Sequence, residues 1–296
     1  MQEKEAPLIS VLMAVKNEEL YLEDAVNSLC KQSWVNWETI IVDDLSEDST
    51  FALATRLSEN ESRVKVLRNI NTGKVGAYNT AFSQATGKYF VFFAGDDLLT
   101  ENSLRDRVSG LFNRPLGACS YGKLKTFSAS SKYDSVEIPR TGVGKISGGG
   151  VMFDRELADF VFPIPSTLPN EDTWTRLCLE YFSNYHCPLS AVVLRYRIHE
   201  NNSHRRGVGF DSTSAMLSKR HAAVQIFYDL NKKRLSDKSL ELLRTEIICG
   251  NLRSEGNLLG LLMLRIPLRK KLAALATANK YIFKIKMRFF RFFTGR

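Results

Sequence analysis

Two adjacent carboxylates, Asp96 and Asp97, follow an apolar segment of the chain, YFVFFAG at residues 89–95. Apolar and aromatic residues in an unbroken run are typical of a strand that is buried on both faces. Two like charges at the edge of a core are costly unless a cation compensates them. Mg²⁺ and Mn²⁺ take oxygen ligands of this kind, usually together with substrate phosphates. The pattern therefore predicts a metal–diphosphate site at the C-terminal end of a central strand, where open α/β sheets bind their ligands.

A second carboxylate pair, Asp43 and Asp44, ends another apolar segment, ETIIV at residues 38–42. A carboxylate there could accept hydrogen bonds from a nucleotide base or a ribose hydroxyl. Taken alone, an acidic turn or a helix cap is the more ordinary explanation. The polar loop KNEE at residues 16–19 leaves the same choice open, because it could present backbone N–H groups to a ligand or be a simple capped turn.

Two further groups of residues with possible chemical roles occur later in the chain. Glu171 and Asp172 stand at the start of an expected helix, where acidic residues are favourable in any case. A general base acting on an acceptor hydroxyl would nevertheless have to be a carboxylate or a histidine. Arg197 and His199 follow an expected strand and could hold a diphosphate and complete a metal shell, or could be structural.

The elements that would position these residues alternate regularly over the first ~120 residues, which predicts a parallel sheet. Strands are expected at residues 8–15, 38–44, 64–67, 89–93 and 118–121. Helices are expected at residues 21–31, 46–57, 74–85 and 102–112, the second with Ser46 or Ser49 as its cap. Further on, residues 142–150 are glycine-rich and residues 162–169 proline-rich, which predicts loops. A helix at 170–181, a strand at 191–198 and helical periodicity over 212–264 complete the expectation.

The charge of the chain is concentrated at its C-terminus. Residues 265–296 contain ten Lys or Arg and no Asp or Glu, which exceeds the whole net charge of +9 and leaves −1 for the other 264 residues. The near-neutral charge of residues 1–264 argues against nucleic-acid binding by this part of the chain. The five cysteines have no metal-type spacing, no window reaches the roughly 18 apolar residues of a membrane span, and the charged N-terminus is unlike a signal peptide. We therefore expect a cytoplasmic protein with reduced thiols.

The tail has a helical pattern of its own. Lys280, Lys284, Arg288 and Arg291 form one stripe, and another face holds Ile282, Ile285, Phe289, Phe292 and Phe293. An aromatic face beside a basic stripe is typical of a helix that lies in an anionic membrane interface. A helix packed on the protein's own core is the alternative.

Four segments in order resemble the inverting glycosyltransferases of family two, which have the GT-A fold. They are SVLMAVKNEELYLEDAVNSLCKQSWVNWETIIVDDLSEDST, NTGKVGAYNTAFSQATGKYFVFFAGDD, NEDTWTRL and YRIHENN, within residues 8–205. The resemblance implies an α/β, Rossmann-like nucleotide-diphospho-sugar transferase fold with a mostly parallel sheet and a helical C-terminal extension. We expect a catalytic domain at residues 1–211, a helical region at 212–264 and a membrane-associating tail at 265–296.

The resemblance also implies roles for single residues. Asp172 matches the general base, Asp97 is expected to ligate the metal directly, and His199 resembles a further metal ligand. The expected nucleotide-sugar-binding residues are Val15, Asn17, Asp44, Lys74, Asn79, Asp96 and Arg197, with Asp44 reading the base and Asp96 near the ribose or sugar. Many members have an Asp where this chain has Ala94, so the division of roles between Asp96 and Asp97 stays open. The QxxRW motif of the processive synthases is missing, so polymer synthesis is not expected.

The function implied is a metal-dependent (Mn²⁺ or Mg²⁺), inverting transfer of a hexosyl group from a nucleotide-diphosphate sugar, most readily a UDP-sugar. The acceptor would be a glycan or a lipid-linked sugar in bacterial surface polysaccharide or glycolipid biosynthesis, at the inner face of the membrane. A sugar-nucleotide pyrophosphorylase would need a GxGTR-type loop after the first strand, and VKNEE is not such a loop. A catalytically inactive, membrane-associated scaffold remains the alternative outside enzymes, although every acidic motif is present.

Overall fold

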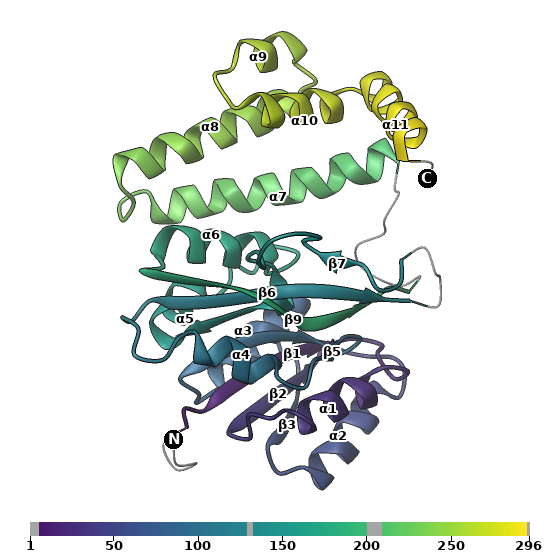
Figure 1. The fold of residues 1–296 in the computed structure, drawn as a ribbon, viewed down its shortest axis with the longest axis vertical. Coiled ribbons are helices and arrows are strands. Elements are labelled where there is room, and N and C mark those ends of the chain that lie inside the picture. The colour runs from purple at the N-terminus through teal and green to yellow at the C-terminus, as the bar shows by residue number, and fades with distance from the viewer. Residues whose placement is uncertain (1–5, 129–132, 200–208, 295–296) are drawn as a thin grey trace. The chain divides into compact units, whose positions relative to one another are not determined.

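A computed structural model describes residues 6–128, 133–199 and 209–294, with side chains as far as residue 288. The chain divides into two compact units, Met1–Asn202 and Ser203–Arg296. Each is built from one continuous stretch of sequence (Figure 1). The division therefore falls before the boundary expected at residue 211, and residues 212–264 and 265–296 belong to one unit. The side chains of Phe289, Arg291, Phe292 and Phe293 in the predicted tail pattern lie outside the described residues.

The described part of the first unit contains one nine-stranded sheet whose order is β3-β2-β1-β4-β8-β6-β9-β5, with β7 paired to β6. Its first half is parallel, as the sequence predicts, and consists of β3 (Val64–Arg68), β2 (Trp37–Asp43), β1 (Ile9–Val15) and β4 (Tyr89–Ala94). The strands β1 and β4 are neighbours inside the sheet and are almost fully buried, which explains their unbroken apolar sequences.

Helices follow these strands as expected, with shorter bounds than the sequence predicts for some of them. They are α1 (Leu22–Cys30), α2 (Thr50–Asn60), α3 (Lys74–Ser83) and α4 (Ser103–Ser109). Of the two serines expected to cap α2, Ser49 is confirmed as the N-cap residue, but its side chain accepts no capping hydrogen bond. Asp48 Oδ1 instead accepts from the Thr50 N–H at 2.9 Å, because a carboxylate is the stronger acceptor.

The second half of the sheet contains antiparallel pairs that the sequence does not reveal. Strand β8 (Val151–Asp154) runs antiparallel to both β4 and β6 (Ala118–Phe127), and β6 runs parallel to β9 (Tyr185–Arg197). The sequence also does not predict the short strands β5 (Leu98–Leu99) and β7 (Glu137–Ile138). Four-residue and two-residue strands are too short to show a periodicity, which explains why they are missed. The remaining elements are the 3₁₀ turn Gly148–Gly150, α5 (Arg155–Val161) and α6 (Asp172–Phe182).

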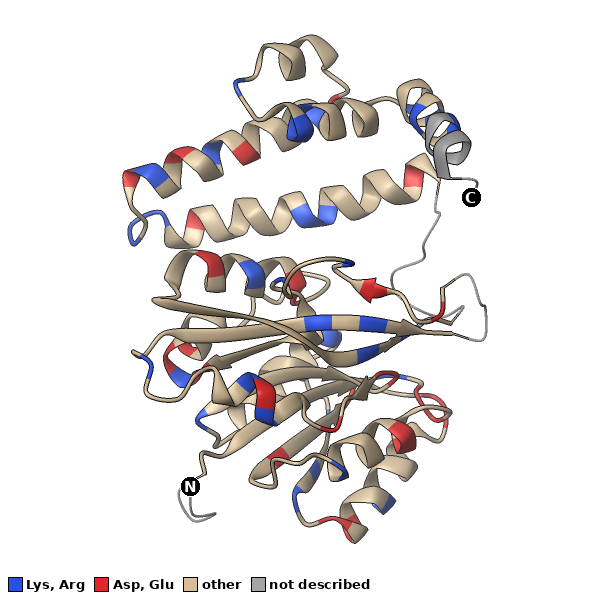
Figure 2. Cartoon of the chain, in the orientation of Figure 1, with Lys and Arg blue, Asp and Glu red and all other residues tan. Residues whose placement is uncertain are grey.

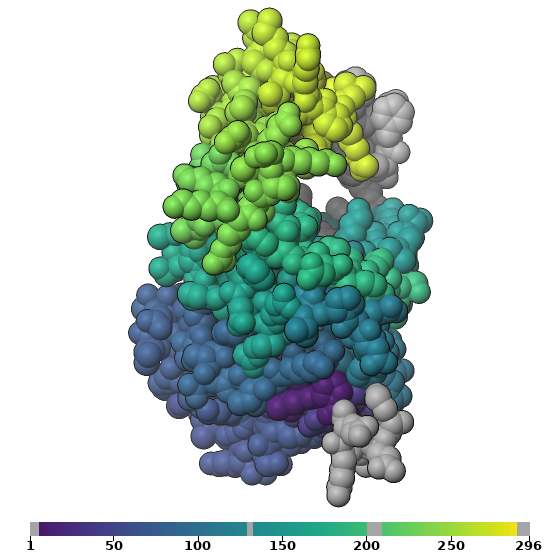
Figure 3. All heavy atoms as spheres, turned by 90° about the vertical axis from the view of Figure 1, so that its left-hand side faces the viewer, coloured from purple at the N-terminus to yellow at the C-terminus, as the bar shows by residue number. Residues whose placement is uncertain are grey.

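The second unit is helical, as expected for residues 212–264. It contains α7 (Phe210–Asn231), α8 (Asp237–Ser254), α9 (Leu258–Met263), α10 (Leu268–Ala278) and α11 (Lys280–Thr294). Figure 2 shows Lys and Arg, and no acidic residue, on α10 and on α11 as far as residue 288, and the space-filling view in Figure 3 shows this part of the chain in yellow tones. Within the described residues, no helix combines the length and the apolarity needed to cross a membrane.

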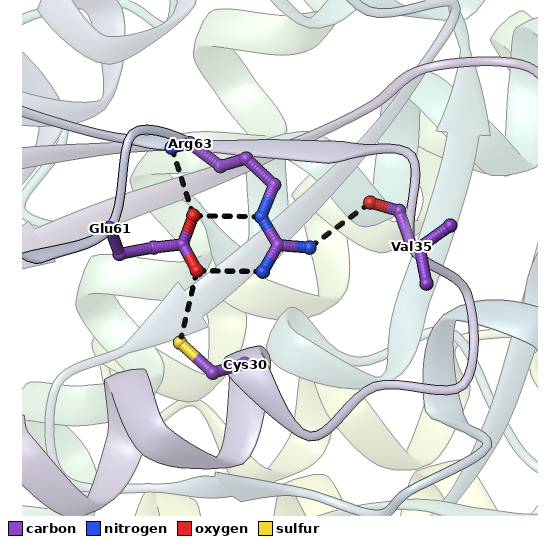
Figure 4. Close-up of polar contacts among 4 residues, drawn as sticks. All are labelled: Cys30, Val35, Glu61 and Arg63. Carbon is purple, nitrogen blue, oxygen red and sulfur yellow. Dashed lines mark hydrogen bonds and ion pairs between the residues drawn. The ribbon is translucent and has the colours of Figure 1, made fainter.

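A polar cluster holds the turn that leads into β3 (Figure 4). The Arg63 guanidinium binds both oxygens of Glu61, at 2.9 Å from Nε and 2.7 Å from Nη2, and its Nη1 donates to the Val35 carbonyl at 3.1 Å. The same guanidinium lies 3.9 Å from the centre of the Trp37 ring. Bidentate pairing fixes the planes of both groups. The cluster therefore attaches the edge strand to the turn before β2.

Candidate active site

The carboxyl ends of the central parallel strands bring the predicted acidic motifs to one edge of the sheet. Val15 at the end of β1 pairs with Asp43 of β2, and Ala14 pairs with Ala94 of β4. The loops that begin at residues 16, 44 and 95 are therefore neighbours. Segments from much later in the chain join them through Arg197, His199 and Glu171, each of which contacts a residue of these loops or of α3.

The loop after β1 is attached to the loop after β2. The N–H groups of residues 17, 18 and 19 donate to side chains of the second loop, namely Ser46, Thr50 and Asp48. Protein acceptors therefore occupy these N–H groups, which favours the ordinary turn over the ligand-binding loop among the two alternatives. Asn17 adopts a left-handed backbone with φ 54°, and its Oδ1 accepts from the Glu47 N–H at 2.9 Å. Val15 is buried, and its carbonyl accepts from the Asp44 N–H at 2.8 Å.

Asp44 links the same edge to the N-terminus of α3. Its Oδ1 accepts from the Gly73 N–H and from Asn69 Nδ2, both at 2.8 Å. None of the residues that the structure describes donates to its other oxygen, Oδ2. Asp44 is 8% exposed. One oxygen of this carboxylate is therefore structural, and the other is left as an acceptor for a bound molecule.

Asp96 and Asp97 have different surroundings. The Asp96 Oδ2 lies 3.0 Å from His199 Nε2, and both side chains are about one seventh exposed, at 14% and 15%. Asp97 is 4% exposed, and its Oδ1 accepts from the Arg197 N–H at 2.9 Å. Burial raises the pKa of Asp97, and the Asp96 carboxylate raises it further. The partly open carboxylate of the pair is thus Asp96, and the buried one fixes the end of β9.

Arg197 itself is held by several contacts. Its Nε donates to the Asp96 carbonyl at 2.8 Å, and its Nη2 lies 3.2 Å from Asp24 Oδ2. The guanidinium lies 4.5 Å from the centre of the Tyr21 ring, and the same ring lies 4.9 Å from the His199 ring. These contacts bring Arg197 and His199 beside Asp96. They also show that part of the hydrogen-bonding capacity of Arg197 goes to the protein itself.

Glu18 is a site residue that sequence reasoning did not single out. Burial, together with the nearby carboxylates of Asp96 and Asp48, raises the pKa of Glu18 to about 8. A Cβ on Gly95 would lie 2.9 Å from Val15 and 3.3 Å from the Glu18 side chain, so the glycine permits this close approach. The only available signal was the position of Glu18 directly after Asn17, in a loop that already had a predicted role.

The donor atoms at this edge fit a divalent cation that is shared with a ligand. Within residues 6–128, 133–199 and 209–294, no three His, Cys, Asp or Glu side chains converge to hold a metal by themselves. Asp96 and His199 nevertheless offer an oxygen and a nitrogen side by side. Mg²⁺ and Mn²⁺ sites of this kind use one or two side chains together with phosphate oxygens. The residues present therefore fit a cation that binds with a diphosphate.

Lys74 and Glu171 form an ion pair across the site. Lys74 Nζ lies 3.1 Å from Glu171 Oε1, with the two side chains 41% and 4% exposed. Desolvation lowers the pKa of Lys74, but the Glu171 carboxylate and other neighbours raise it more strongly, well above its ordinary value. Asp172 follows as the first residue of α6 and is exposed. A Cβ on Gly148 would lie 2.9 Å from Asp172 Oδ1, so this carboxylate lies against the glycine-rich turn.

Asn79 does not project freely toward the other candidates. Its Nδ2 donates to the Ile164 carbonyl at 2.9 Å, and its Oδ1 accepts from the Ile164 N–H at 2.8 Å. This reciprocal pair attaches α3 to the proline-rich loop of residues 162–169, which is a loop as expected. The structure thus gives Asn79 a role in holding that loop.

Comparisons with known proteins agree with this architecture. Residues 10–141 match the model of the family described as glycosyl transferase family 2. A putative teichuronic acid biosynthesis glycosyltransferase, TuaG of Bacillus subtilis (strain 168), is 28% identical over 211 residues, which are 66% of this chain and 81% of that protein. The Escherichia coli UDP-Glc:alpha-D-GlcNAc-diphosphoundecaprenol beta-1,3-glucosyltransferase WfgD is 29% identical over 168 residues. That match spans 53% of this chain and 64% of WfgD, just under two thirds of its length.

Solved structures with the same fold include S. aureus TarS 1-349 in complex with UDP-GlcNAc, with a TM-score of 0.60 and 17% identity. The match covers 93% of this chain and 82% of TarS 1-349. Mannosyltransferase PcManGT from Pyrobaculum calidifontis, in complex with GDP-Man and Mn²⁺, has a TM-score of 0.59 and 18% identity. That match covers 97% of this chain and 80% of PcManGT. At these identities the likeness concerns the fold, and it confirms the expected GT-A architecture.

Proposed function

The first unit of this chain contains a family 2 glycosyltransferase domain with the GT-A fold, and from this premise we propose that the protein transfers a hexosyl group from a nucleotide-diphosphate sugar to an acceptor hydroxyl with inversion. One observation carries the proposal. The Asp96–His199 pair and the Lys74–Glu171–Asp172 group, which come from separate segments of the chain, meet at the carboxyl edge of the parallel strands. This edge is where open α/β sheets bind nucleotides.

The donor would lie along the ends of β2 and β4. The open oxygen of Asp44 is available to a base N–H or a ribose hydroxyl, and the Lys74 ammonium to the diphosphate. Asp96 and His199 would hold a divalent cation, Mn²⁺ or Mg²⁺, which when bound offsets charge on the departing nucleoside diphosphate. The surroundings of the two aspartates favour Asp96 over Asp97 as the direct ligand. We assign Asp97 to fixing the end of β9.

Asp172 would act as the general base. Its carboxylate is exposed at the N-terminus of α6, so an acceptor hydroxyl can reach it. The base takes the hydroxyl proton while that oxygen forms a bond to the anomeric carbon. The bond from the anomeric carbon to the diphosphate breaks on the opposite face, which inverts the configuration. The nucleoside diphosphate then leaves with the electron pair of the broken bond.

The relatives support a bacterial surface polysaccharide or glycolipid as the product. TuaG is described as a teichuronic acid biosynthesis enzyme, and WfgD acts on a sugar attached to diphosphoundecaprenol. TarS is seen with UDP-GlcNAc. We accordingly favour a UDP-sugar as donor and a glycan or lipid-linked acceptor, at the inner, cytoplasmic face of the membrane.

The test is nucleoside-diphosphate release from a panel of UDP- and GDP-sugars, with and without Mn²⁺, for the wild type and the Asp172→Asn variant. We expect release with at least one donor and an acceptor extract, loss of transfer in the variant, and unchanged UDP binding. Transfer at the wild-type rate by Asp172→Asn would refute the assignment of the base. Complete inactivity of the wild type with every donor would favour the inactive-scaffold alternative.

The second unit supports an interaction with an anionic membrane surface. Leu259, Leu262 and Met263 are 66%, 54% and 75% exposed and share one face of α9. Lys280, Lys284 and Arg288 are exposed on α11, and no acidic residue follows Glu255. Phe283 is buried, and the centre of its ring lies 5.7 Å from the centre of the Phe210 ring. Helix α11 therefore also packs against α7 within the second unit. A helix with one face buried and exposed basic residues can rest on a membrane.

Vesicle co-sedimentation tests this surface. We expect binding to vesicles containing phosphatidylglycerol, weak binding to phosphatidylcholine, and loss of binding when residues 265–296 are deleted. The variant Leu259→Asp should weaken binding, while Leu230→Asp on α7, at a similarly exposed position (64%), should not. Equal partitioning of the deletion variant and the wild type would contradict the membrane role.

A further inference from the structure

The Lys74–Glu171 ion pair connects the donor side of the site to the acceptor side. Lys74 is the first residue of α3, and Glu171 is the N-cap residue of α6, 97 positions later in the chain. The Glu171 side chain is nearly inaccessible, whereas Lys74 is partly open. The pair therefore runs from the interior to the open edge where the donor diphosphate is expected.

The Lys74–Glu171 pair is not arranged to contribute much to the free energy of folding. The second oxygen of Glu171, Oε2, is buried and has no hydrogen-bond partner among the described residues. A buried carboxylate is costly to desolvate, and its cost is offset only when all its acceptor positions are satisfied. Apolar replacements of such pairs are often neutral or stabilising. Stabilisation of the fold is therefore a poor reason for placing a carboxylate at this position.

The residue next to the pair is the proposed base. Asp172 is joined directly to Glu171, and its Oδ1 lies against Gly148. The glycine limits the carboxylate on one side, and the ion pair holds the first turn of α6 on the other. A shift of Glu171 would move this turn and the Asp172 carboxylate with it. A misplacement of 1 Å in an active site can reduce the rate about 10²-fold.

We propose that Lys74 and Glu171 are positioning residues, which set the place of the Asp172 carboxylate and connect it to the bound donor. This inference rests on the proposed function, because it takes Asp172 as the base and the diphosphate as a neighbour of Lys74. The Lys74 ammonium donates one hydrogen bond to Glu171, and its solvent-accessible N–H groups contact the diphosphate of the donor. Donor binding thereby restrains the base before the acceptor arrives.

The experiment separates positioning from stability. The denaturant midpoint, the affinity for UDP, and kcat and KM with the most active donor are measured for Lys74→Met, Glu171→Gln and the double variant Lys74→Met/Glu171→Leu. We expect Lys74→Met to lower the midpoint and the UDP affinity, because Glu171 is left uncompensated. Glu171→Gln should lower kcat by about 10- to 10²-fold with little change in KM. The double variant should recover the midpoint while its kcat stays low.

A matched control lies on the same helix. Removal of the exposed Arg176–Glu180 pair of α6 by Arg176→Met/Glu180→Gln should leave kcat and UDP affinity unchanged. Recovery of kcat together with the midpoint in the double variant would overturn the proposal, as would a wild-type kcat in Glu171→Gln. If the single variants do not fold, the denaturant midpoint and kcat of Lys74→Arg are compared with those of the double variant instead. Failure of the proposed base is distinguishable, because it would show as undiminished transfer by Asp172→Asn.

Discussion

The Asp96 carboxylate and the His199 imidazole lie 3.0 Å apart although 103 positions separate them in the chain. The adjacent Asp97 is turned into the protein and holds the Arg197 backbone. Two neighbouring aspartates thus divide two tasks. One remains partly open beside the His199 imidazole, and the other fixes the strand end that brings this imidazole to the site.

The first prediction concerns that division. Asp96→Asn and His199→Ala should each lower Mn²⁺-stimulated transfer, about 10²-fold or more for Asp96→Asn, because a Lewis acid supplies several kcal/mol of charge stabilisation. Asp97→Asn should retain Mn²⁺ stimulation, since burial raises the pKa of Asp97 and the amide oxygen can still accept from Arg197. The measurement is activity as a function of Mn²⁺ concentration. The assignment fails if Asp97→Asn loses stimulation and Asp96→Asn keeps it.

Gly148 provides a steric test of the base. In Gly148→Ala the new Cβ would stand 2.9 Å from Asp172 Oδ1, so the carboxylate must shift. We expect kcat to fall by about 10- to 10²-fold without a change in UDP affinity. Gly209→Ala is the matched control, because no atom of the described residues lies within 4 Å of its Cβ. An unchanged kcat in Gly148→Ala would show that the Asp172 position is not critical.

We expect Asn79 to stabilise the fold and not to bind the nucleotide. Its two hydrogen bonds with the Ile164 backbone are lost in Asn79→Ala, and a part-buried N–H and carbonyl are left unpaired. We expect urea denaturation to show a loss of about 1–3 kcal/mol in the free energy of unfolding. The affinity for UDP should change little. A large fall in UDP affinity without loss of stability would restore Asn79 to the nucleotide site.

The Glu61–Arg63 pair makes a prediction about pH. The hydrogen bonds from Arg63 lower the pKa of Glu61 to about 2, from an ordinary value of 4.5. A carboxylate whose pKa is depressed by folding stabilises the folded state above its unfolded pKa, and this contribution is lost as the pH falls toward 2. Glu61→Gln should therefore cost roughly 0.5–1 kcal/mol at pH 7.

The comparison for this pair is made by chemical denaturation between pH 7 and pH 3. The stability difference between the wild type and Glu61→Gln should shrink as the pH falls below about 4.5, because Glu61 then takes up a proton in the unfolded wild type while folding still holds its pKa near 2. Glu59→Gln, at an exposed position in the last turn of α2, is the control and should show no such convergence. A difference that stays constant with pH would mean that the pair contributes nothing through its charge.

Much of the parallel half of the sheet could be predicted because its signals are local. The strands β1, β2 and β4 are runs of apolar residues, and the helices between them have their own periodicity. Asp44, Asp96 and Asp172 could be proposed as site residues because each stands where such an element ends or begins. These patterns need no knowledge of distant contacts.

The antiparallel half could not be predicted in the same way. The strand β8 has four residues and is defined by its position between β4 and β6. The second half of β6 and the first half of β9 consist mostly of half-buried and exposed residues, so their length follows from pairing with each other. Short and half-exposed strands owe their existence to their neighbours.

The sequence by itself determined the fold class and the place of the site, since strand ends with paired carboxylates are local features. Only the tertiary structure decided how those carboxylates are used. It separated Asp96 from Asp97, gave Lys74 a buried partner in Glu171, and brought Glu18 beside Asp96. Each of these relationships joins residues far apart in the chain or depends on burial. Burial and proximity exist only after the chain has folded.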